Sequence, residues 1–209
     1  MPSAKKGEDF KVETCKILDH IGAVKFGAFK LTSGRLSPYY IDLRIVPSFP
    51  DAFEKVCEAY ANVIRTQVGL DHVDRIAGIP VAGIPFASVV ALNLRKPFLY
   101  VRKGARTHGR ERRIEGIIAP GNRVLLIDDL ITGGLSLLKA GKAIMAEGGV
   151  VEDAVVLIDR EEGGKEKLAK NGIKLHALLS IDEAVRTLHE LGSIDDDQVK
   201  TILKQIKKK

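Results

Sequence analysis

The stretch VLLIDDLITGGLS, residues 124–136, decides the fold of this chain. Four apolar residues predict a buried strand over 124–127, and they are followed by Asp128, Asp129, a Thr-Gly-Gly turn and a helix with apolar periodicity. Open α/β sheets bind ligands at the carboxyl ends of their strands. The backbone N–H groups of such a turn, with the helix start behind them, can hold a phosphate. Because carboxylates can hold sugar hydroxyls or a metal ion, the segment predicts a cradle for a phosphorylated sugar.

The segments on either side predict an α/β fold with a mostly parallel central sheet flanked by helices. Short apolar stretches alternate with helical spacing, which is typical of a parallel sheet covered on both faces. The expected strands are residues 75–79, 98–102, 124–127, 154–158 and 173–179. The expected helices are residues 85–94, 135–147, 165–171, 182–191 and 196–207.

The N-terminal part of the chain has a different pattern. Helical spacing over residues 8–21 precedes a Gly-punctuated, β-prone segment, FGAFKLTSGRLSPYYIDLR, which predicts one or two strands or a hairpin. Helical spacing returns over residues 50–68. We therefore expect residues 1–45 to form a small N-terminal helix and hood, and residues 46–209 to form the α/β core with the C-terminal helices, within a single structural domain overall.

Composition limits the classes of function. The chain has 209 residues, 29% of them charged, and a net charge of +6, which suits a globular protein with a polyanionic partner. No apolar run approaches the roughly 20 residues of a membrane span, and the first residues have no apolar signal-peptide core. We expect a cytoplasmic protein that binds no membrane. Nucleic acid is disfavoured as the polyanion because the basic segment has no interleaved aromatic residues.

The two cysteines do not predict a disulfide or a metal site. Cys15 and Cys57 lie far apart without a CxxC pattern. Both fall in segments with helical spacing, so we expect both to be small buried side chains.

Three further segments carry candidate ligand-binding residues. IAGIPVAGIPFA, residues 76–87, fits either a backbone approach to a pyrophosphate or a tight turn into a helix. RKGARTHGRERR, residues 102–113, fits a solvated basic loop, and beside a phosphate cradle it fits better a lid over a leaving anion. LIDREEGG, residues 157–164, brings Arg160 to the same sheet edge, where it can pair with a ligand carboxylate or with a neighbouring acid.

Together these segments resemble the type I phosphoribosyltransferases, and within them the orotate branch. VLLIDDLITGGLS resembles the loop for 5-phosphoribosyl 1-diphosphate (PRPP), the β-prone segment resembles the hood, RKGARTHG resembles the mobile catalytic loop, and LIDREEGG resembles the segment beside the base. The resemblance runs over roughly residues 10–190. It implies transfer of ribose 5-phosphate from PRPP to N1 of orotate, which gives orotidine 5′-monophosphate and pyrophosphate in de novo pyrimidine (UMP) biosynthesis.

The resemblance also implies roles for individual residues. Arg106, Asp128 and Asp129 would be catalytic, with the two carboxylates facing the ribose hydroxyls. PRPP would be bound by these three residues and by Val81, Ala82, Arg102, Lys103, His108, Leu130, Ile131, Thr132, Gly133, Gly134, Leu135 and Ser136. Orotate would be bound by Tyr40, Ile41, Thr132 and Arg160. The implied cofactor is Mg²⁺, held mainly by substrate and water, and the implied assembly is a homodimer that shares the mobile loop.

The chain departs from the family pattern at a few positions. Arg106 and Thr32 stand where lysine is common, and Gly133 stands where Thr or Ala is frequent. Arg106 keeps the positive charge but does not release a proton near neutral pH. Two alternatives therefore remain open: a phosphoribosyltransferase for another base, and a non-catalytic PRPP-binding regulator.

Overall fold

The computed structural model describes residues 2–30, 34, 36–102 and 113–207. They fall into two units. The first, which we call the hairpin unit, comprises Met1–Val56 and Leu179–Lys209, and the second, the core unit, is Cys57–Leu178. From the sequence we expected a boundary near residue 45 and placed the C-terminal helices with the core. The structure instead groups these helices with the N-terminal residues.

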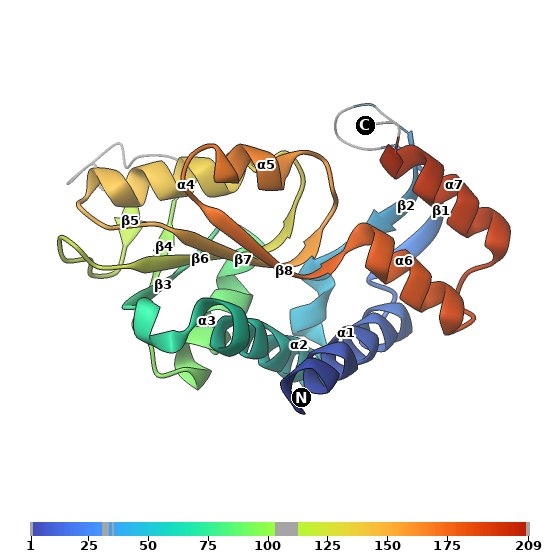
Figure 1. The fold of residues 1–209 in the computed structure, drawn as a ribbon, viewed down its shortest axis with the longest axis horizontal. Helices are drawn as coiled ribbons and strands as arrows, with labels where there is room; N and C mark the ends of the chain where they lie inside the picture. The colour runs from blue at the N-terminus through green and yellow to red at the C-terminus, as the bar shows by residue number, and fades with distance from the viewer. Residues whose placement is uncertain (1, 31–33, 35, 103–112, 208–209) are drawn as a thin grey trace. The chain divides into compact units, whose positions relative to one another are not determined.

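The core unit is built on a six-stranded sheet with the strand order β5-β4-β3-β6-β7-β8 (Figure 1). β3 pairs in parallel with both β4 and β6, and β6 pairs in parallel with β7, whereas β5 is antiparallel to β4. The predicted mostly parallel sheet is confirmed. The strands are β3 (Arg75–Gly78), β4 (Phe98–Val101), β5 (Ile114–Glu115), β6 (Val124–Ile131), β7 (Asp153–Asp159) and β8 (Lys174–Ser180).

The central strand β6 is longer than the sequence predicted. The apolar run ends at Ile127, but Asp128 pairs with Val156 and Leu130 pairs with Ile158 of β7. Pairing with β7 keeps the backbone extended through Asp128 and Asp129, although aspartate by itself does not favour a strand. The two carboxylates therefore belong to the final residues of the strand rather than to the turn that follows it.

Helices cover both faces of this sheet, as the alternating pattern predicts. α3 (Gly83–Asn93) lies on one face, and α4 (Leu135–Ala146) and α5 (Gly164–Ala169) lie on the other (Figure 1). The buried cluster under α4 joins its residues Leu137 and Ile144 to Leu126 and Val156 of the sheet. None of the helices in the described part of the chain is both long enough and apolar enough to cross a membrane.

The predicted helix over residues 50–68 is divided. It forms α2 (Pro50–Val63) and then a π-helical turn, η2 (Ile64–Val68). Gly69, with a φ of 89°, ends the turn and leads into a short 3-10 helix, η3 (Leu70–His72). The positive φ at this point favours glycine.

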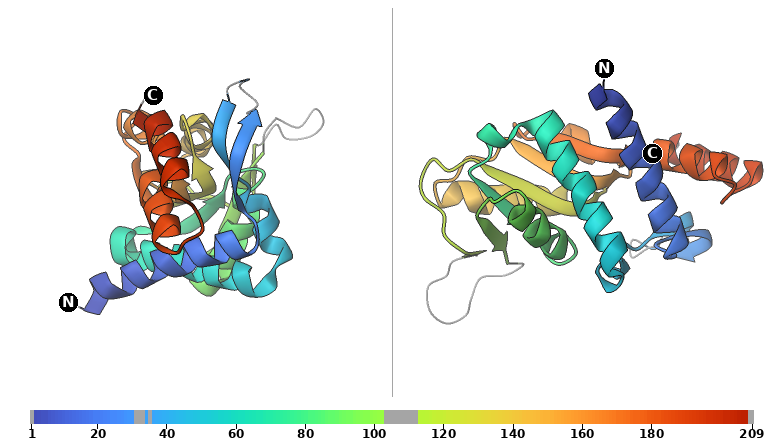
Figure 2. Two further views of the ribbon diagram at one scale, coloured as in Figure 1. Left: turned by 90° about the vertical axis from the view of Figure 1, so that its right-hand side faces the viewer. Right: turned by 90° about the horizontal axis from the view of Figure 1, so that it is seen from below.

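The hairpin unit combines the two ends of the chain. The antiparallel hairpin of β1 and β2, with Val24 opposite Ile41, lies beside α6 and α7, and α1 runs beneath them (Figure 2). The elements of this unit are α1 (Pro2–His20), β1 (Val24–Lys30), β2 (Leu36–Ile41), the 3-10 helix η1 (Leu43–Ser48), the start of α2, α6 (Ile181–Glu190) and α7 (Asp196–Lys207).

Polar contacts explain why the C-terminal helices join the N-terminal residues. Lys11 of α1 forms an ion pair with Glu183 of α6. The Ser193 hydroxyl donates a hydrogen bond to Asp19 at 2.7 Å, and the Gln205 side chain of α7 donates to the carbonyl of Leu36 at 3.0 Å. These partners are far apart in the sequence, and local periodicity carries no information about them.

Both cysteines are buried, as expected. Cys15 lies in α1 and Cys57 in α2, and neither forms a disulfide. Burial raises the pKa of each thiol to about 12. A thiol with so high a pKa stays protonated at neutral pH and behaves as an apolar side chain.

Candidate active site

Three segments that the sequence singled out meet around the end of β6. The backbone N–H of Ile79, after β3, donates to the carbonyl of Ile127 at 3.0 Å. On the other side, the N–H of Arg160, after β7, donates to the carbonyl of Ile131 at 3.0 Å. The turn after β3 and the segment after β7 therefore flank the two acids, at the sheet edge where α/β proteins bind ligands.

The turn after β3 packs directly on Asp128. A Cβ added at Gly83 would lie 2.6 Å from the carbonyl oxygen of Ile127 and 2.8 Å from the Cα of Asp128. Only glycine fits so close an approach, which brings the backbone of this turn against the carboxylate residue. Val81 is exposed, and Ala82 is the N-cap of α3. The turn starts the helix, which is one of the two possibilities for this segment, and a backbone contact of Val81 and Ala82 with a pyrophosphate stays a prediction.

Asp128 is a buried carboxylate whose negative charge calls for a compensating hydroxyl or cation. It is only 8% exposed, and its Oδ1 accepts a hydrogen bond from the N–H of Asp129 at 3.0 Å. Burial, with the negative charge of Asp129 added, raises the pKa of Asp128 well above its ordinary value. Keeping an acid in such a place costs free energy unless a ligand hydroxyl or a cation compensates for it, which is typical of a functional site.

Tyr60 of α2 fixes the backbone of the two acids. Its hydroxyl donates to the carbonyl of Asp128 at 2.8 Å and lies 3.4 Å from that of Asp129. The side chain is fully buried, with its ring packed against Phe86 at a centroid distance of 5.6 Å. Burial raises the pKa of Tyr60, so the phenol remains a donor. The sequence predicts only helical spacing around Tyr60, because no local pattern links it to residues so far along the chain.

A hollow of about 170 Å³ follows the acids. Gly134, with a φ of 72°, is the N-cap of α4 and provides no capping side chain. The first N–H groups of α4 are therefore available to a ligand anion. The predicted loop residues that line the hollow are Asp128, Leu130, Ile131, Thr132, Gly133, Gly134, Leu135 and Ser136. Asp129 does not line it. Two residues that were not predicted, Leu137 and Lys167, line it as well.

Lys167 of α5 also lines the hollow and is not among the residues predicted from the sequence. A Cβ added at Gly164 would collide with the carbonyl oxygen of Thr132 and lie 2.6 Å from Cγ1 of Ile131. The first residue of α5 is therefore pressed against the turn, and Lys167, three residues later, lies on the same side of the helix. Helical spacing counted from Gly164 is the signal that could have identified it.

Arg160 lies at the expected sheet edge in a buried ion pair. Its Nη2 is 3.1 Å from Oε1 of Glu162, and both side chains are about one-tenth exposed. A pair with a neighbouring acid is one of the two possibilities that the sequence left open. The adjacent Asp159 accepts a hydrogen bond from the N–H of Glu161 at 2.8 Å, and burial raises its pKa.

The remaining predicted residues lie in different parts of the chain. Arg102 follows β4 and forms an ion pair with Glu115 of β5, with 3.0 Å between Nη1 and Oε1. The Tyr40 hydroxyl accepts a hydrogen bond from Arg44 at 2.9 Å, and Ile41 is 7% exposed. Since adjacent strand residues point to opposite faces, Tyr40 and Ile41 do not present their side chains to the same surface. Four residues lie outside the described residues: Thr32, Lys103, Arg106 and His108.

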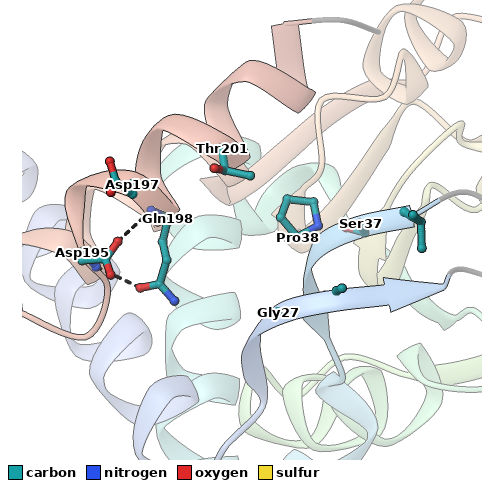
Figure 3. Close-up of a pocket in the computed structure, with 9 residues that line it drawn as sticks. Gly27, Ser37, Pro38, Asp195, Asp197, Gln198 and Thr201 are labelled. Carbon is teal, nitrogen blue, oxygen red and sulfur yellow. Dashed lines mark hydrogen bonds between the residues drawn. The ribbon is translucent and has the colours of Figure 1, made fainter.

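A larger hollow of about 540 Å³ lies within the hairpin unit, between β1, β2 and the start of α7 (Figure 3). The polar groups of Asp195 and Gln198 satisfy each other. Gln198 N–H donates to Asp195 at 2.8 Å, and Asp195 N–H donates to the Gln198 side chain at 2.9 Å. This reciprocal cap stabilises the start of α7. No predicted site residue lines this hollow, and the polar groups of Asp195 and Gln198 serve the helix.

Metal ligands are sparse in the described part of the chain. Within it, no group of three or more His, Cys, Asp or Glu side chains could hold a metal ion. Asp128 and Asp129 are adjacent oxygen donors at the end of β6. Such a pair suits an ion that keeps most of its water and substrate ligands, as Mg²⁺ does.

Comparison with known proteins agrees with this geometry. The Phosphoribosyl transferase domain family matches residues 49–188. An orotate phosphoribosyltransferase of Cenarchaeum symbiosum is 44% identical over 181 residues, covering 87% of this chain and 90% of that relative. The crystal structure of orotate phosphoribosyltransferase from Aeropyrum pernix has a TM-score of 0.72 at 32% identity and covers 86% of this chain and 99% of its own. The structure of Leishmania donovani UMP synthase has a TM-score of 0.84 at 32% identity; the match covers 95% of this chain but only 42% of that longer one.

This chain belongs to the type I phosphoribosyltransferases, which confirms the predicted fold class. Within them it belongs to the orotate phosphoribosyltransferases, which are pentosyltransferases of pyrimidine biosynthesis. The resemblance found in the sequence is thereby confirmed.

Proposed function

We propose that this chain transfers the 5-phosphoribosyl group of PRPP to N1 of orotate, which releases pyrophosphate and gives orotidine 5′-monophosphate. The observation that carries the proposal is the hollow at the end of β6, where a glycine turn and a helix start lie beside a buried carboxylate. A phosphate and a sugar hydroxyl are the groups that such a pair of features recognises. The identity with orotate phosphoribosyltransferases supports the choice of base.

Each part of PRPP has a proposed place. Residues 132–136 hold the 5-phosphate through backbone N–H groups and the hydroxyls of Thr132 and Ser136. Asp128 and Asp129 accept hydrogen bonds from the ribose hydroxyls, which would relieve the buried charge of Asp128. The backbone at Val81 and Ala82 approaches the pyrophosphate from the turn that packs on Asp128.

The reaction exchanges one bond at C1 of the ribose for another, and N1 of orotate loses its proton, which leaves with the diphosphate or passes to water. N1 of orotate attacks C1 of the ribose while the bond from C1 to the diphosphate oxygen breaks, and the electron pair leaves with the diphosphate. Positive charge builds on the sugar ring, as in glycoside cleavage. Asp128 and Asp129, held by Tyr60, are placed to stabilise that charge without reorganising. Holding sugar and base in line contributes further to the rate.

Cations would neutralise the departing diphosphate. We assign this role to Arg102, Lys103, Arg106 and His108, of which only Arg102 is among the described residues. Arg102 would exchange or share its contact with Glu115. Arg106 supplies charge rather than a proton in this scheme, since a guanidinium does not deprotonate near neutral pH.

Mg²⁺ is proposed as the metal that accompanies PRPP. Asp128 and Asp129 fit an ion that takes one or two carboxylates and completes its shell with substrate oxygens and water. When bound, Mg²⁺ would supply positive charge to the diphosphate. The chain's own part is to hold the ribose, orient it and keep water from it.

We assign the orotate contacts to Thr132, Arg160, Tyr40 and Ile41, the residues that the family resemblance implies. A guanidinium pairs well with a carboxylate, and Arg160 already pairs with Glu162. The orotate carboxylate would add to this pair or replace Glu162 in it. Because the Ile41 side chain is buried, its contribution would come from the backbone.

The test is a turnover assay with a choice of bases. The purified chain is mixed with PRPP and Mg²⁺, and the loss of orotate absorbance is followed in parallel with reactions that contain hypoxanthine, adenine or uracil. We expect consumption of orotate alone, with stoichiometric release of pyrophosphate. Consumption of another base would select the alternative enzyme, and PRPP binding without any product would select a non-catalytic regulator.

The proposal extends to assembly and location. We propose a homodimer that shares the segment after Arg102 between subunits, and the cytoplasm as its compartment. Light scattering on the purified chain tests the first, and mixing two inactive variants, one changed in that segment and one in Asp129, tests the sharing. Recovery of activity in the mixture is the expected result, and its absence would contradict a shared segment. Cell fractionation tests the compartment.

A further inference from the structure

We propose that Lys167 of α5 binds the 5-phosphate group of the phosphoribosyl substrate and is the side-chain cation of this subsite. The inference rests on the proposed function and deepens it by adding a residue to the phosphate-binding turn. It comes from the position of α5 relative to residues 132–136, which the structure gives directly.

The first observation is geometric. Lys167 lines the hollow of about 170 Å³ that the turn and the start of α4 also line. Its Nζ lies 3.8 Å from the place where a Cβ would stand on Gly133, the middle of the turn. The ammonium group is therefore in contact range of the turn, close enough to meet an anion bound by its N–H groups.

The second observation explains why the lysine is there. Gly163, with a φ of 82°, is the N-cap of α5, and Gly164 packs against Thr132 and Ile131 so closely that no side chain fits. The two glycines let α5 start on the back of the phosphate turn. A residue three positions after Gly164 is then directed along the same side of the helix, toward the hollow.

The third observation concerns charge. A ribose 5-phosphate group carries close to two negative charges at neutral pH. Among the described residues that line the hollow, Lys167 is the only cation, and Asp128 contributes a carboxylate. Without Lys167, the backbone N–H groups alone would have to offset the phosphate charge next to the Asp128 carboxylate. A lysine ammonium supplies a full compensating charge and up to three donors.

The other lysines of the same helix provide matched comparisons. All three lysines are exposed, but Lys165 and Lys170 line none of the hollow that Lys167 lines. Lys170 is the C-cap of α5, only three residues from Lys167. Lys167→Gln and Lys170→Gln therefore remove the same charge from the same short helix, and only the first removes it from the hollow.

The experiment measures binding and turnover separately. Calorimetry with ribose 5-phosphate gives the affinity of the subsite without chemistry, and steady-state assays with PRPP and orotate give kcat and KM. We expect Lys167→Gln to weaken ribose 5-phosphate binding about tenfold or more, the usual effect of losing a hydrogen bond to a charged group. KM for PRPP should rise by a similar factor with little change in kcat, because the 5-phosphate does not react. Lys170→Gln should change neither value by more than about twofold, and Lys167→Arg should restore most of the affinity.

The outcomes separate the two proposals. If wild-type protein consumes orotate while Lys167→Gln binds ribose 5-phosphate as wild type does, the role of Lys167 is overturned and the proposed function stands. Equal losses in Lys167→Gln and Lys170→Gln would also overturn it, since they would reflect net charge alone. If no orotate is consumed but ribose 5-phosphate binding depends on Lys167, the proposed function fails and the phosphate site stands.

Discussion

Two hollows among the described residues, the one at the end of β6 and the one beside α7, differ in how their walls are fixed. The β6 hollow is the smaller, about 170 Å³ against about 540 Å³. Its surroundings include backbone contacts that admit no Cβ at Gly83 or Gly164 and a carboxylate held in a buried position. In the α7 hollow, Asp195 and Gln198 bond to each other. Size therefore does not identify the site, whereas groups that remain costly without a ligand do.

The largest effect expected on function is at Asp129. Asp129→Asn keeps the shape of the side chain but removes a charge beside the developing positive charge of the sugar. We expect turnover with PRPP and orotate to fall by about a hundredfold or more, the usual effect of losing a preorganised electrostatic contact. Asp197→Asn, at the α7 hollow, is the control and should leave turnover unchanged. Equal turnover in wild type and Asp129→Asn would contradict the assignment of the active site to the end of β6 rather than to the α7 hollow.

Backbone packing at the β6 hollow gives the next largest effect. Gly164→Ala places a methyl group against Thr132 and Ile131, and we expect unfolding free energy to fall by about 1–3 kcal/mol. Gly133→Ala, in the same turn, meets nothing closer than 3.8 Å and should change stability by no more than about 0.5 kcal/mol. Urea unfolding of both variants measures the difference. If the two variants were equally stable, α5 would not be pressed on the turn.

Tyr60→Phe tests the support beneath the acids. The variant leaves the buried carbonyl of Asp128 without its donor, so we expect a loss of about 1–3 kcal/mol in unfolding free energy. Since Tyr60 positions rather than touches the substrate, kcat should fall while KM for PRPP changes less. A loss of stability with wild-type kcat would show that the hydroxyl serves the fold only.

Asp128→Asn should raise the stability of the folded chain while it lowers turnover. The pKa of Asp128 is raised in the folded state above its ordinary value of 3.8, so the folded protein binds this proton more tightly than the unfolded chain does. Its contribution to stability is complete below pH 3.8 and is lost as pH rises through the raised pKa. The variant lacks that loss, so we expect it to be more stable than wild type at neutral pH.

Thermal unfolding across pH measures this difference, and Asp74→Asn is the control of opposite sign. The hydrogen bonds of Arg123 lower the pKa of Asp74 to about 2, so its stabilisation is present above the ordinary value of 3.8 and is lost as pH falls through that window. Asp74→Asn should therefore be less stable than wild type at neutral pH. If Asp128→Asn were less stable than wild type at neutral pH, burial of the Asp128 carboxylate would not cost the folded protein free energy, and this explanation would be contradicted.

The smallest expected effect is at the α7 hollow. Asp195→Ala removes the side chain that caps α7, and we expect a loss of about 1 kcal/mol in unfolding free energy. Turnover and KM should match wild type, because the polar groups of Asp195 and Gln198 serve the helix. A large change in KM for PRPP or orotate would assign the α7 hollow to the catalytic machinery.

Local patterns in the sequence predicted the part of the molecule that local interactions fix. The alternation of apolar strands and helices gave the sheet, and the apolar run before Asp128 gave the strand that ends in the site. The turn could be predicted because its glycines and hydroxyls are consecutive. β5, only two residues long, was missed because such a strand has no periodicity of its own.

Features that depend on distant segments could not be read from the sequence. β6 extends to Ile131 because β7 pairs with it, and the C-terminal helices join the hairpin unit through contacts such as Ser193 with Asp19. Tyr60 reaches the site across a tertiary contact that leaves no local pattern. Lys167 has the helical spacing from Gly164, but the packing of α5 on the turn, which gives that spacing its meaning, is also a tertiary contact. The residues that hold or complement the acids were therefore the ones that the sequence did not reveal.

The most direct test of the central claim is a crystal structure of the chain with PRPP. We predict the 5-phosphate in the turn of residues 132–136, beside Lys167, and the ribose hydroxyls bonded to Asp128 and Asp129. PRPP bound elsewhere, with that turn lacking phosphate and both carboxylates paired only with protein groups, would contradict the account.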